Sequence, residues 1–422
     1  MPQRQRTAAI IGGSLTGLIA ARLLARKGWA AHVFERVPEV LSGRGAGIGT
    51  HPEFFDVLRA ARLPDGPDIG VYVTTRRMFA KDGRVTLEHR YPQVLAHWDS
   101  VYSLLLGSID RDFYHLGKRM TGFAKGHGAV SVQFEDGDTF DADLLIGADG
   151  TRSSVRTVMF PDVTPLYVSY VAWRGTIPEE RFSPSARASM LDYFCFCLPM
   201  GEQMAGYPVR RVKRGHVGSE RDFNFVWYRP TDDRQLETLL TDASGRRHEM
   251  NIPPPLVDPR HKQQAKEDAE QILAPQFAEA VRLADGLFFQ PIYDVETPRM
   301  IDDRVALLGD AAFVARPHLG AGVTKGFSDA MALCQALDRN ISIEPALQEF
   351  ETERLPVGRK MVERARQLGA YMQASRSTDK EKKAAEGYRT PEAVIRETAS
   401  LDFLYGGRAL RFPSFQHQET AS

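Results

Sequence analysis

The stretch that decides the fold reads Thr7-Ala-Ala-Ile-Ile11, then Gly12-Gly-Ser-Leu-Thr-Gly17, and later Ala31-His-Val-Phe-Glu35. The first and last pieces are short apolar runs, typical of buried parallel strands. Between them, apolar residues recur at helical spacing from Leu15 to Leu24, and Lys27-Gly28 ends the helix. A strand, a glycine turn, a helix and a second strand within 29 residues indicate a βαβ unit.

The glycine turn has the chemistry of a dinucleotide site. Gly12 permits a tight turn, Gly17 lets the helix pack close to the strand, and the helix N-terminus offers free N–H groups to a pyrophosphate. Ser14 replaces the middle glycine of the usual fingerprint, and its hydroxyl can itself bond a phosphate. Glu35, 23 residues after Gly12, is placed to accept hydrogen bonds from an adenosine ribose. An ordinary turn with a solvated glutamate is the alternative, and the turn does not separate FAD from NAD.

The rest of the chain alternates between helical and strand-like segments around a β-rich middle. Buried strands are expected at Leu144–Ile146 and Val305–Leu308, and helices after Gly322 and over roughly Ala346–Tyr371. Residues 167–228 alternate in β fashion. Further expected features are hairpins around Asp82-Gly83 and Asp136-Gly137, a helix over Thr231–Leu240, a loop at Ile252–Pro255, and Phe223, Phe225 and Trp227 on one side of a strand. The pattern predicts an α/β fold: a discontinuous Rossmann-like domain, an inserted β-rich domain and a C-terminal helical segment.

Composition narrows the function classes. The 422 residues carry 54 basic and 54 acidic side chains, and 43% are apolar. The zero net charge argues against a nucleic-acid partner and against a basic membrane-surface protein. Three cysteines give no disulfide framework, so a cytoplasmic location is expected, and the apolar stretch 8–25 is too polar and glycine-rich to span a membrane.

Two further motifs each follow an expected strand. Gly147-Ala-Asp149-Gly150 leads into a segment ending at Arg156, and a surface pair between Asp149 and Arg156 is the plainer explanation. The second motif runs from Gly309-Asp310 to Gly320-Ala-Gly322. Asp310 ends a buried strand, where a carboxylate needs hydroxyl or amide partners. The two later glycines let the backbone approach a flat ligand just before a helix begins.

These three motifs, in this order and spacing, resemble the FAD-dependent aromatic hydroxylases, the para-hydroxybenzoate hydroxylase family. Within it, the segments Tyr170–Gly175, Phe223–Tyr228 and Gly309–His318 look most similar to the 2,6-dihydroxypyridine 3-monooxygenase branch. The resemblance covers roughly residues 7–370. It implies an FAD-binding domain from residues 1–75, 100–165 and 285–345, a substrate domain from 76–99 and 166–284, and a C-terminal helix and tail over 346–422.

The resemblance also implies roles for individual residues. The first turn would hold the pyrophosphate, Glu35 the adenosine ribose, Asp310 the ribityl chain, and residues 317–323 the isoalloxazine. One departure is Ser100, where the family usually carries an arginine that contacts FAD. The expected cofactor-binding residues are Gly12, Gly13, Ser14, Leu15, Thr16, Gly17, Glu35, Arg36, Arg44, Gly47, Ile48, Asp149, Gly309, Asp310, Pro317, Gly320, Ala321, Gly322 and Val323, with no metal ligands.

The implied reaction consumes NADH or NADPH and O₂ and hydroxylates a small ring by way of a flavin hydroperoxide. The ring is expected to be a hydroxylated aromatic or N-heteroaromatic, with a hydroxypyridine favoured. A Tyr or His near the flavin would take the proton of the ring hydroxyl, and His318, Tyr207 and His51 are the candidates. Each has a plainer explanation: Tyr207 as a packed strand residue, His51 as a loop residue and His318 as flavin-side packing.

Several alternatives stay open at this stage. The ring substrate can instead be phenolic, indolic or a polyketide, or the flavin can act as an oxidase or dehydrogenase without oxygen insertion. A non-catalytic flavin module is a third class. Cys195 and Cys197 are expected to pack in the core on one strand face, and the basic run Arg210–Arg214 to be a solvated turn. The sequence leaves the oligomeric state open, a homodimer included, and leaves the role of the segment after Ser375 open.

Overall fold

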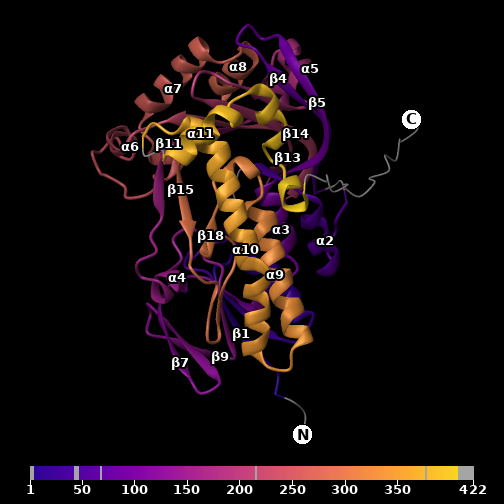
Figure 1. The fold of residues 1–422 in the computed structure, drawn as a ribbon, viewed down its shortest axis with the longest axis vertical. Coiled ribbons are helices and arrows are strands. Elements are labelled where there is room, and N and C mark those ends of the chain that lie inside the picture. The colour runs from indigo at the N-terminus through magenta and orange to yellow at the C-terminus, as the bar shows by residue number, and fades with distance from the viewer. Residues whose placement is uncertain (1–3, 42–46, 67–68, 214–215, 376–377, 407–422) are drawn as a thin grey trace, which may run out of the picture.

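The computed structural model describes residues 4–41, 47–66, 69–213, 216–375 and 378–406. The chain is a mixed α/β protein built on two large sheets, which confirms the expected fold class. Figure 1 shows the two sheets stacked along the long axis, with α9 and α10 running beside them. Within the described residues, no helix combines the length and the apolar character needed to cross a membrane.

The first sheet has six strands, and all but the edge strand β16 are parallel. Its order is β16 (Ile301–Asp302), β17 (Val305–Leu307), β10 (Leu144–Gly147), β1 (Thr7–Ile11), β2 (Ala30–Phe34) and β6 (Tyr114–His115). β1 lies between β10 and β2 and is almost completely buried. The carboxyl ends of the strands therefore meet at one edge, where ligands bind in such sheets.

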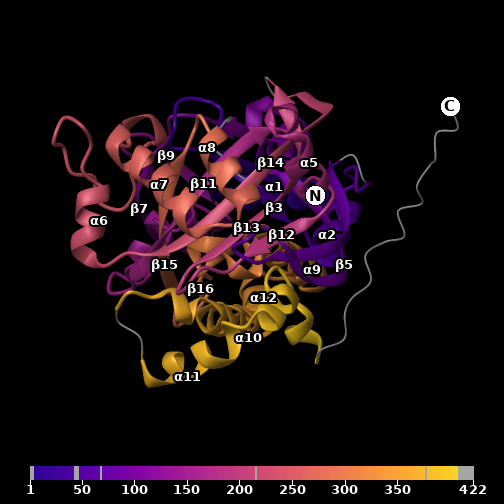
Figure 2. The same cartoon turned by 90° about the horizontal axis from the view of Figure 1, so that it is seen from above.

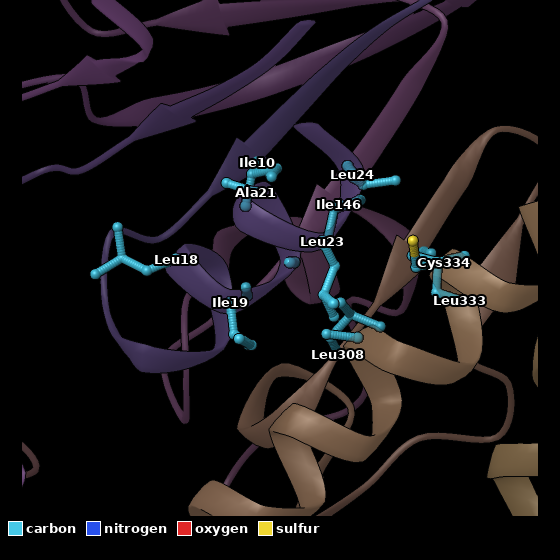
Figure 3. Packing of buried hydrophobic residues seen from close by; sticks show 14 of the residues in the cluster. Ile10, Leu18, Ile19, Ala21, Leu23, Leu24, Ile146, Leu308, Leu333 and Cys334 are labelled. Carbon is cyan, nitrogen blue, oxygen red and sulfur yellow. The ribbon is translucent and has the colours of Figure 1, made fainter. Parts of the chain in front are cut away.

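Helices α1 (Leu15–Ala25), α9 (Gly322–Arg339) and α10 (Ile343–Gly369) pack with this sheet. Figure 3 shows Leu23 and Leu24 of α1, Ile146 of β10 and Leu333 of α9 gathered in one apolar cluster. A three-stranded sheet of β7 (Met120–Gly126), β8 (Ala129–Phe134) and β9 (Thr139–Ala142) packs against the same core through aromatic rings. Smaller helices near the sheet are α2 (Pro52–Ala60), α3 (Trp98–Leu106) and α4 (Ser154–Met159).

The second sheet has nine strands and is antiparallel except where β12 lies parallel to β4. Its order is β18 (Phe313–Val314), β15 (Phe288–Glu296), β11 (Leu166–Pro178), β14 (His216–Pro230), β13 (Gln203–Lys213), β12 (Phe194–Cys197), β4 (Gly70–Phe79), β5 (Val85–His97) and β3 (Gly47–Gly49). The strands of the two sheets alternate along the chain. The boundaries between the two expected domains stay a prediction.

The two faces of the nine-stranded sheet have different neighbours. Phe223, Phe225 and Trp227 are fully buried on one face, as the alternation predicted, together with Cys195 and Cys197. Helices α5 (Pro184–Met190), α7 (Pro259–Ile272) and α8 (Pro275–Leu283) supply buried residues to that cluster, and α6 (Asp233–Leu239) adds Leu236. Figure 2 shows α7 and α8 lying across these strands. The opposite face is left for a cavity.

The sequence patterns found the central strands and helices of the parallel sheet but missed several helices. β1, α1, β2, β10, β17, α6, α9 and α10 lie where they were expected to within a few residues. α7 and α8 were not expected. α7 reads Pro-Arg-His-Lys-Gln-Gln-Ala-Lys-Glu-Asp-Ala-Glu-Gln-Ile, and its buried residues are only Ala265 and Ala269. Two alanines one turn apart give almost no hydrophobic periodicity, so this helix is invisible to a pattern search.

The chain after Ser375 was expected to be a polar tail and is instead partly helical. α11 (Asp379–Tyr388) and α12 (Pro391–Glu397) follow α10, and Figure 2 shows these three helices together on one side of the molecule. Leu401 is buried in a small cluster with residues of α10. We name residues 391–402 the C-terminal strap, because they lie against the nine-stranded sheet.

Candidate active site

Two adjoining cavities lie where the two sheets meet. One, of about 560 Å³, is enclosed by the nine-stranded sheet and the turns around residues 47–49 and 314–323. The other, of about 600 Å³, lies at the carboxyl ends of the parallel strands. We call them the ring cavity and the nucleotide cavity. They share five lining residues, namely Trp98, Arg152, Asp310, Gly322 and Val323.

The first glycine turn lines the nucleotide cavity through Gly12, Ser14, Leu15 and Thr16. Gly12 has φ +110°, a conformation that disfavours other residues. A Cβ at Gly17 would lie 1.9 Å from the carbonyl oxygen of Gly12. Glycine is therefore required at position 17 mainly because the turn passes so close to it. The sequence had suggested a different reason, the close packing of the helix against the strand.

Ser14 caps α1 without a side-chain hydrogen bond, so its hydroxyl is not used to close the helix. The first N–H groups of a helix have no partner within the helix. Gly13 does not line the cavity; its N–H donates to Glu35 Oε2 at 2.9 Å, and Tyr114 leaves no room for a side chain there. The turn thus presents backbone donors and one hydroxyl at the positive end of α1.

Glu35 lies at the cavity wall after β2, beside Arg36. Its two carboxylate oxygens accept from the N–H groups of Gly13 and Val37, each at 2.9 Å. The alternative of a solvated glutamate is wrong, because only 6% of Glu35 is exposed. Each carboxylate oxygen has a second lone pair, so this geometry leaves Glu35 able to accept from a ligand hydroxyl.

The Asp149 motif is a helix cap as well as a cavity wall. Asp149 Oδ2 accepts from the backbone N–H of Ser154 at 2.7 Å and from its hydroxyl at 2.8 Å, at the start of α4. Asp149 Oδ1 is buried without a partner, and burial raises the pKa of this carboxyl. The surface pair with Arg156 is ruled out, since Arg156 is 1% exposed and donates to the carbonyls of Ala311 and Thr151.

The Asp310 motif stands where the cavities join. Gly309 lies behind the wall, and its N–H donates to Asp329 Oδ2 at 3.0 Å. Burial holds the pKa of the Asp310 carboxyl above its ordinary value, although the nearby Lys325 opposes part of this shift. Lys325 is 1% exposed, its Nζ makes no hydrogen bond, and Asp310 and Asp329 each approach it to 3.9 Å. This lysine lines the ring cavity between two carboxyl groups.

The turn before α9 borders both cavities. Pro317, Gly320 and Ala321 line the ring cavity, and Gly322 and Val323 line both. Ala321, at the N-cap position of α9, has no polar side chain to bond the first N–H groups of the helix. A side chain at Gly322 would meet no atom within 4 Å. The N-terminus of an 18-residue helix therefore opens on the space where the cavities meet.

The inner face of the nine-stranded sheet forms the floor of the ring cavity. Tyr207 on β13 and Tyr228 on β14 line it, and Phe194 stands across Tyr207 with ring centres 4.9 Å apart. Burial raises the pKa of Tyr228 to about 12 and raises that of Tyr207 further. Gly47 and Ile48, on β3, close one side, and Gly47 has no room for a side chain because Tyr207 lies against it. The floor is aromatic, with phenol groups that stay protonated.

His318 lines the ring cavity, but its chemistry is that of a neutral imidazole. Its Nε2 shares a hydrogen bond with the hydroxyl of Tyr170 at 2.8 Å, and its Nδ1 is buried without a partner. Burial, reinforced by Arg316, lowers the pKa of His318 to about 3. Such a histidine is a weak base at neutral pH.

Four of the expected site residues that the structure describes, Gly13 among them, line neither cavity. His51 does not line either cavity: it lies beneath α9 with Nδ1 3.1 Å from Thr324 Oγ1. Gly309 and Gly17 shape the walls from behind. Arg44 falls outside the described residues. Ser100 is buried without a partner for its hydroxyl and lines neither cavity.

The C-terminal strap supplies wall residues that the sequence did not suggest. Thr398 and Ala399 line the ring cavity, and the N–H of Ala399 donates to the carbonyl of His318 at 2.8 Å. Arg76, fully buried on β4, holds the strap by donating to the carbonyls of Ile395, Thr398 and Ala399 at 2.6–3.1 Å. Gln93 also donates to the Ala399 carbonyl, at 3.2 Å.

Sequence reasoning also missed the polar residues of the sheet face. Arg174 and Gln203 line the ring cavity, and Trp98 stands between the two cavities. The available signal was the alternation along residues 167–228, which places Arg174 on the opposite face from Trp173. Alternation gives the face of a residue but not its neighbours, because β11 pairs with β14 and β15, which lie much further along the chain.

The two cavities fit FAD by shape and by donor set. An elongated site is lined at one end by a glycine turn and a helix N-terminus, at its centre by Asp310, and at the other end by a flat turn before a second helix. Asp149 Oδ1 and Lys325 Nζ are buried without hydrogen bonds, and buried polar atoms of this kind usually have a partner. A dinucleotide with hydroxyls, a diphosphate and a polar ring supplies such partners.

The chain is similar in sequence and in fold to known proteins. A family described as FAD binding domain-like matches residues 167–294. The 2,6-dihydroxypyridine 3-monooxygenase of Paenarthrobacter nicotinovorans is 31% identical over 372 residues, which cover 86% of this chain and 91% of that protein. The 3-amino-4-hydroxybenzoate 2-monooxygenase of Streptomyces cremeus is 28% identical, covering 87% and 88%.

The solved structure of 2,6-dihydroxypyridine-3-hydroxylase from Arthrobacter nicotinovorans superposes with a TM-score of 0.82 at 28% identity, covering 90% of this chain and 96% of that one. A cavity for a dinucleotide that opens onto a cavity for a small ring is the arrangement of a flavin enzyme that acts on aromatic compounds. The chain belongs to the FAD-dependent aromatic-ring monooxygenases, which use NAD(P)H and O₂.

Proposed function

We propose that this enzyme hydroxylates a hydroxypyridine ring held in the ring cavity. The observation that carries the proposal is that cavity itself: about 560 Å³, floored by aromatic residues, supplied with side-chain N–H and O–H donors, and joined to the nucleotide cavity at Asp310 and Gly322. Its size suits a small ring beside a flavin. The similarity over nearly the whole chain to an enzyme named for 2,6-dihydroxypyridine supports the choice of ring.

In this proposal the nucleotide cavity holds the adenosine and pyrophosphate of FAD. The turn from Gly12 to Gly17 and the N-terminus of α1 face the pyrophosphate, and Glu35 accepts from ribose hydroxyls. Asp310 accepts from the linking chain, and the turn 317–323 lies along the ring system. Arg36 and Arg152 add positive charge at the wall of the same cavity.

Bound FAD supplies the electron transfer from NAD(P)H and the oxygen activation that place one oxygen atom on the ring. The chain's residues prepare the site for it. The N-terminus of α9 directs its positive end at the junction of the cavities, where it stabilises negative charge on a bound ring system. The aromatic floor and the strap enclose the ring cavity and limit the entry of water.

The protonation states of the wall residues decide how the ring hydroxyl is activated. His318 is neutral, bound to Tyr170, and too weak a base to take the proton at neutral pH. The phenols of Tyr207 and Tyr228 stay protonated, so each can donate a hydrogen bond to a ring oxygen. We propose that His318 positions the wall through Tyr170 and the strap, and that the ring proton leaves to solvent.

The proposal is tested with purified, FAD-loaded enzyme and a panel of hydroxypyridines, hydroxybenzoates and phenols. The expected result is that a hydroxypyridine stimulates NAD(P)H oxidation and gains one oxygen atom by mass, with little H₂O₂ formed. Turnover of phenolic rings alone contradicts the choice of ring, and NAD(P)H oxidation that yields only H₂O₂ with every ring contradicts hydroxylation. We further propose a cytoplasmic location, which NAD(P)H as co-substrate and three free, buried cysteines support.

A further inference from the structure

Arg174 is a cation on the floor of the ring cavity. It lies on β11 opposite Val226 of β14 and Phe288 of β15. Its side chain lines the cavity, on the same face as Tyr228, which lies diagonally across on β14. Diagonal neighbours on a sheet are within reach of long side chains. A guanidinium therefore stands among aromatic and aliphatic side chains, beside the space for the substrate ring.

The Arg174 guanidinium makes no hydrogen bond or ion pair with any residue that the structure describes, and its Nε is buried. The more deeply buried arginines of this chain have partners for their Nη groups, although the Nε atoms of Arg76 and Arg156, like that of Arg174, are buried without one. Arg76 and Arg156 donate to backbone carbonyls, and Arg316 pairs with Asp294 and Glu381. Arg174 is only partly buried, and its unpaired Nη groups are free to meet an anion from outside the chain that enters the cavity.

The other polar groups of this floor are also unpaired donors. Gln203 Nε2 is buried without an acceptor. The amide oxygen of Gln203 does have a partner, since it accepts from the hydroxyl of Tyr371 at 2.7 Å. Asn224, on the same face of β14 but outside the lining of the cavity, likewise has no acceptor for its Nδ2, while its oxygen accepts from the N–H of Gly47. Among the described lining residues the sole carboxylate is Asp310, at the junction with the nucleotide cavity. The ring cavity thus has a surplus of donors.

From this surplus we propose that Arg174 anchors a negatively charged oxygen of the substrate ring. The proposal rests on the proposed function in assigning this cavity to the ring. The oxygen belongs either to an ionised ring hydroxyl or to a ring carboxylate, and the planar guanidinium can meet either with two parallel N–H groups. An ionised hydroxyl held this way makes the ring electron-rich without a protein base, which agrees with the weak basicity of His318.

The test measures binding rather than turnover, by calorimetry on FAD-loaded enzyme without NAD(P)H. The ligands are matched pairs: 2,6-dihydroxypyridine with 2,6-dimethoxypyridine for the ring oxyanion, and 6-hydroxynicotinate with its amide for the carboxylate. A third pair, 3-amino-4-hydroxybenzoate with its amide, has no pyridine ring. We expect the wild-type enzyme to prefer the anionic member of at least one pair by roughly 10- to 100-fold, the range of a charge-assisted hydrogen bond.

Arg174→Gln and Arg174→Met are expected to abolish that preference and leave binding of the neutral twin within about threefold, while Arg174→Lys retains part of it. Arg234→Gln, an exposed arginine on α6, is the matched control and should keep it. FAD content and melting temperature show whether each variant is folded.

The preferred pair also tells which anion is recognised. A wild-type enzyme without any preference for the anion overturns the inference, whether or not the variants fold, and so does a folded neutral variant that keeps the preference. Preference only within the benzoate pair contradicts the pyridine substrate but supports the anchor. The two proposals therefore fail on different results.

Discussion

The two sheets shape their halves of the site in different ways. At the parallel sheet, the nucleotide cavity is shaped mainly by backbone: a positive-φ glycine, a helix N-terminus and a turn with no space for a side chain. At the nine-stranded sheet, the ring cavity is shaped by side chains from β11, β13 and β14 and by the C-terminal strap. Where backbone geometry shapes the cavity, an added side chain disrupts the turn. A wall made of side chains can accept many substitutions. The cofactor half is accordingly constrained, and the substrate half is free to differ between relatives.

Gly17→Val gives the largest effect, because it tests the backbone half directly. A Cβ there would lie 1.9 Å from the carbonyl oxygen of Gly12, so the turn must open and its N–H groups lose their alignment. We expect FAD content below about a tenth of wild type, measured by visible absorbance of the purified protein. Gly286→Val, at a site with no atom within 4 Å of the added Cβ, is the control. Normal FAD content in Gly17→Val would show that the turn does not hold the cofactor.

Asp310→Ala comes next, since it removes a single side chain at the junction of the two halves. Loss of the carboxylate that we propose to accept from the cofactor should weaken FAD binding by roughly 10- to 100-fold, and Asp310→Asn should weaken it less. Titration of the apoenzyme with FAD measures this. Asp338→Ala, which removes an exposed ion pair with Lys27, should leave FAD affinity unchanged. Wild-type affinity in Asp310→Ala would remove this residue from the cofactor site.

Arg76→Met tests the side-chain half. Four backbone carbonyls of the strap accept from this buried guanidinium or lie within 3.4 Å of it. Their loss should lower the free energy of unfolding by about 3 kcal/mol and loosen the wall at Thr398 and Ala399. We expect bound FAD to remain while the share of NAD(P)H converted to H₂O₂ rises.

The neighbouring Arg77→Met is the control for Arg76→Met. Arg77 belongs to the same strand but pairs with Glu88 and donates to Ser189, away from the strap. Arg77→Met should change the free energy of unfolding without raising the share of NAD(P)H that is converted to H₂O₂. Equal H₂O₂ from both variants would mean that the strap does not seal the cavity.

His51→Gln gives the smallest effect and concerns stability alone. Burial lowers the pKa of His51 to about 3, against 6.5 in the unfolded chain. The unfolded state therefore binds a proton that the folded state excludes between those values, so this stabilising contribution is complete above pH 6.5 and is lost as the pH falls toward 3. Denaturant unfolding measures the free energy of unfolding at pH 7 and at pH 5. The decrease between these two values should be about 1–2 kcal/mol smaller in His51→Gln than in wild type. Parallel curves for the two proteins would show that His51 titrates normally.

The same difference between the halves explains what could be predicted. The turn 12–17, Glu35, Asp149 and Asp310 were found from the sequence because each cavity-lining segment is short and directly follows its own strand. Arg174, Gln203 and the strap were missed, because their contacts join segments that lie from about 50 to more than 300 positions apart in the chain. His51 was misjudged for a related reason: its place before Pro52 suggested a loop, and only the packing of α9 over it shows that it is buried.

The most direct test is a crystal structure of the enzyme with FAD and a bound ring ligand. The account predicts a dinucleotide that runs from the turn at Gly12 past Asp310 to the turn at Gly320, with the ring on the sheet face beside Arg174 and Tyr207. FAD bound outside the two adjoining cavities, or a ring bound away from that sheet face, would contradict it.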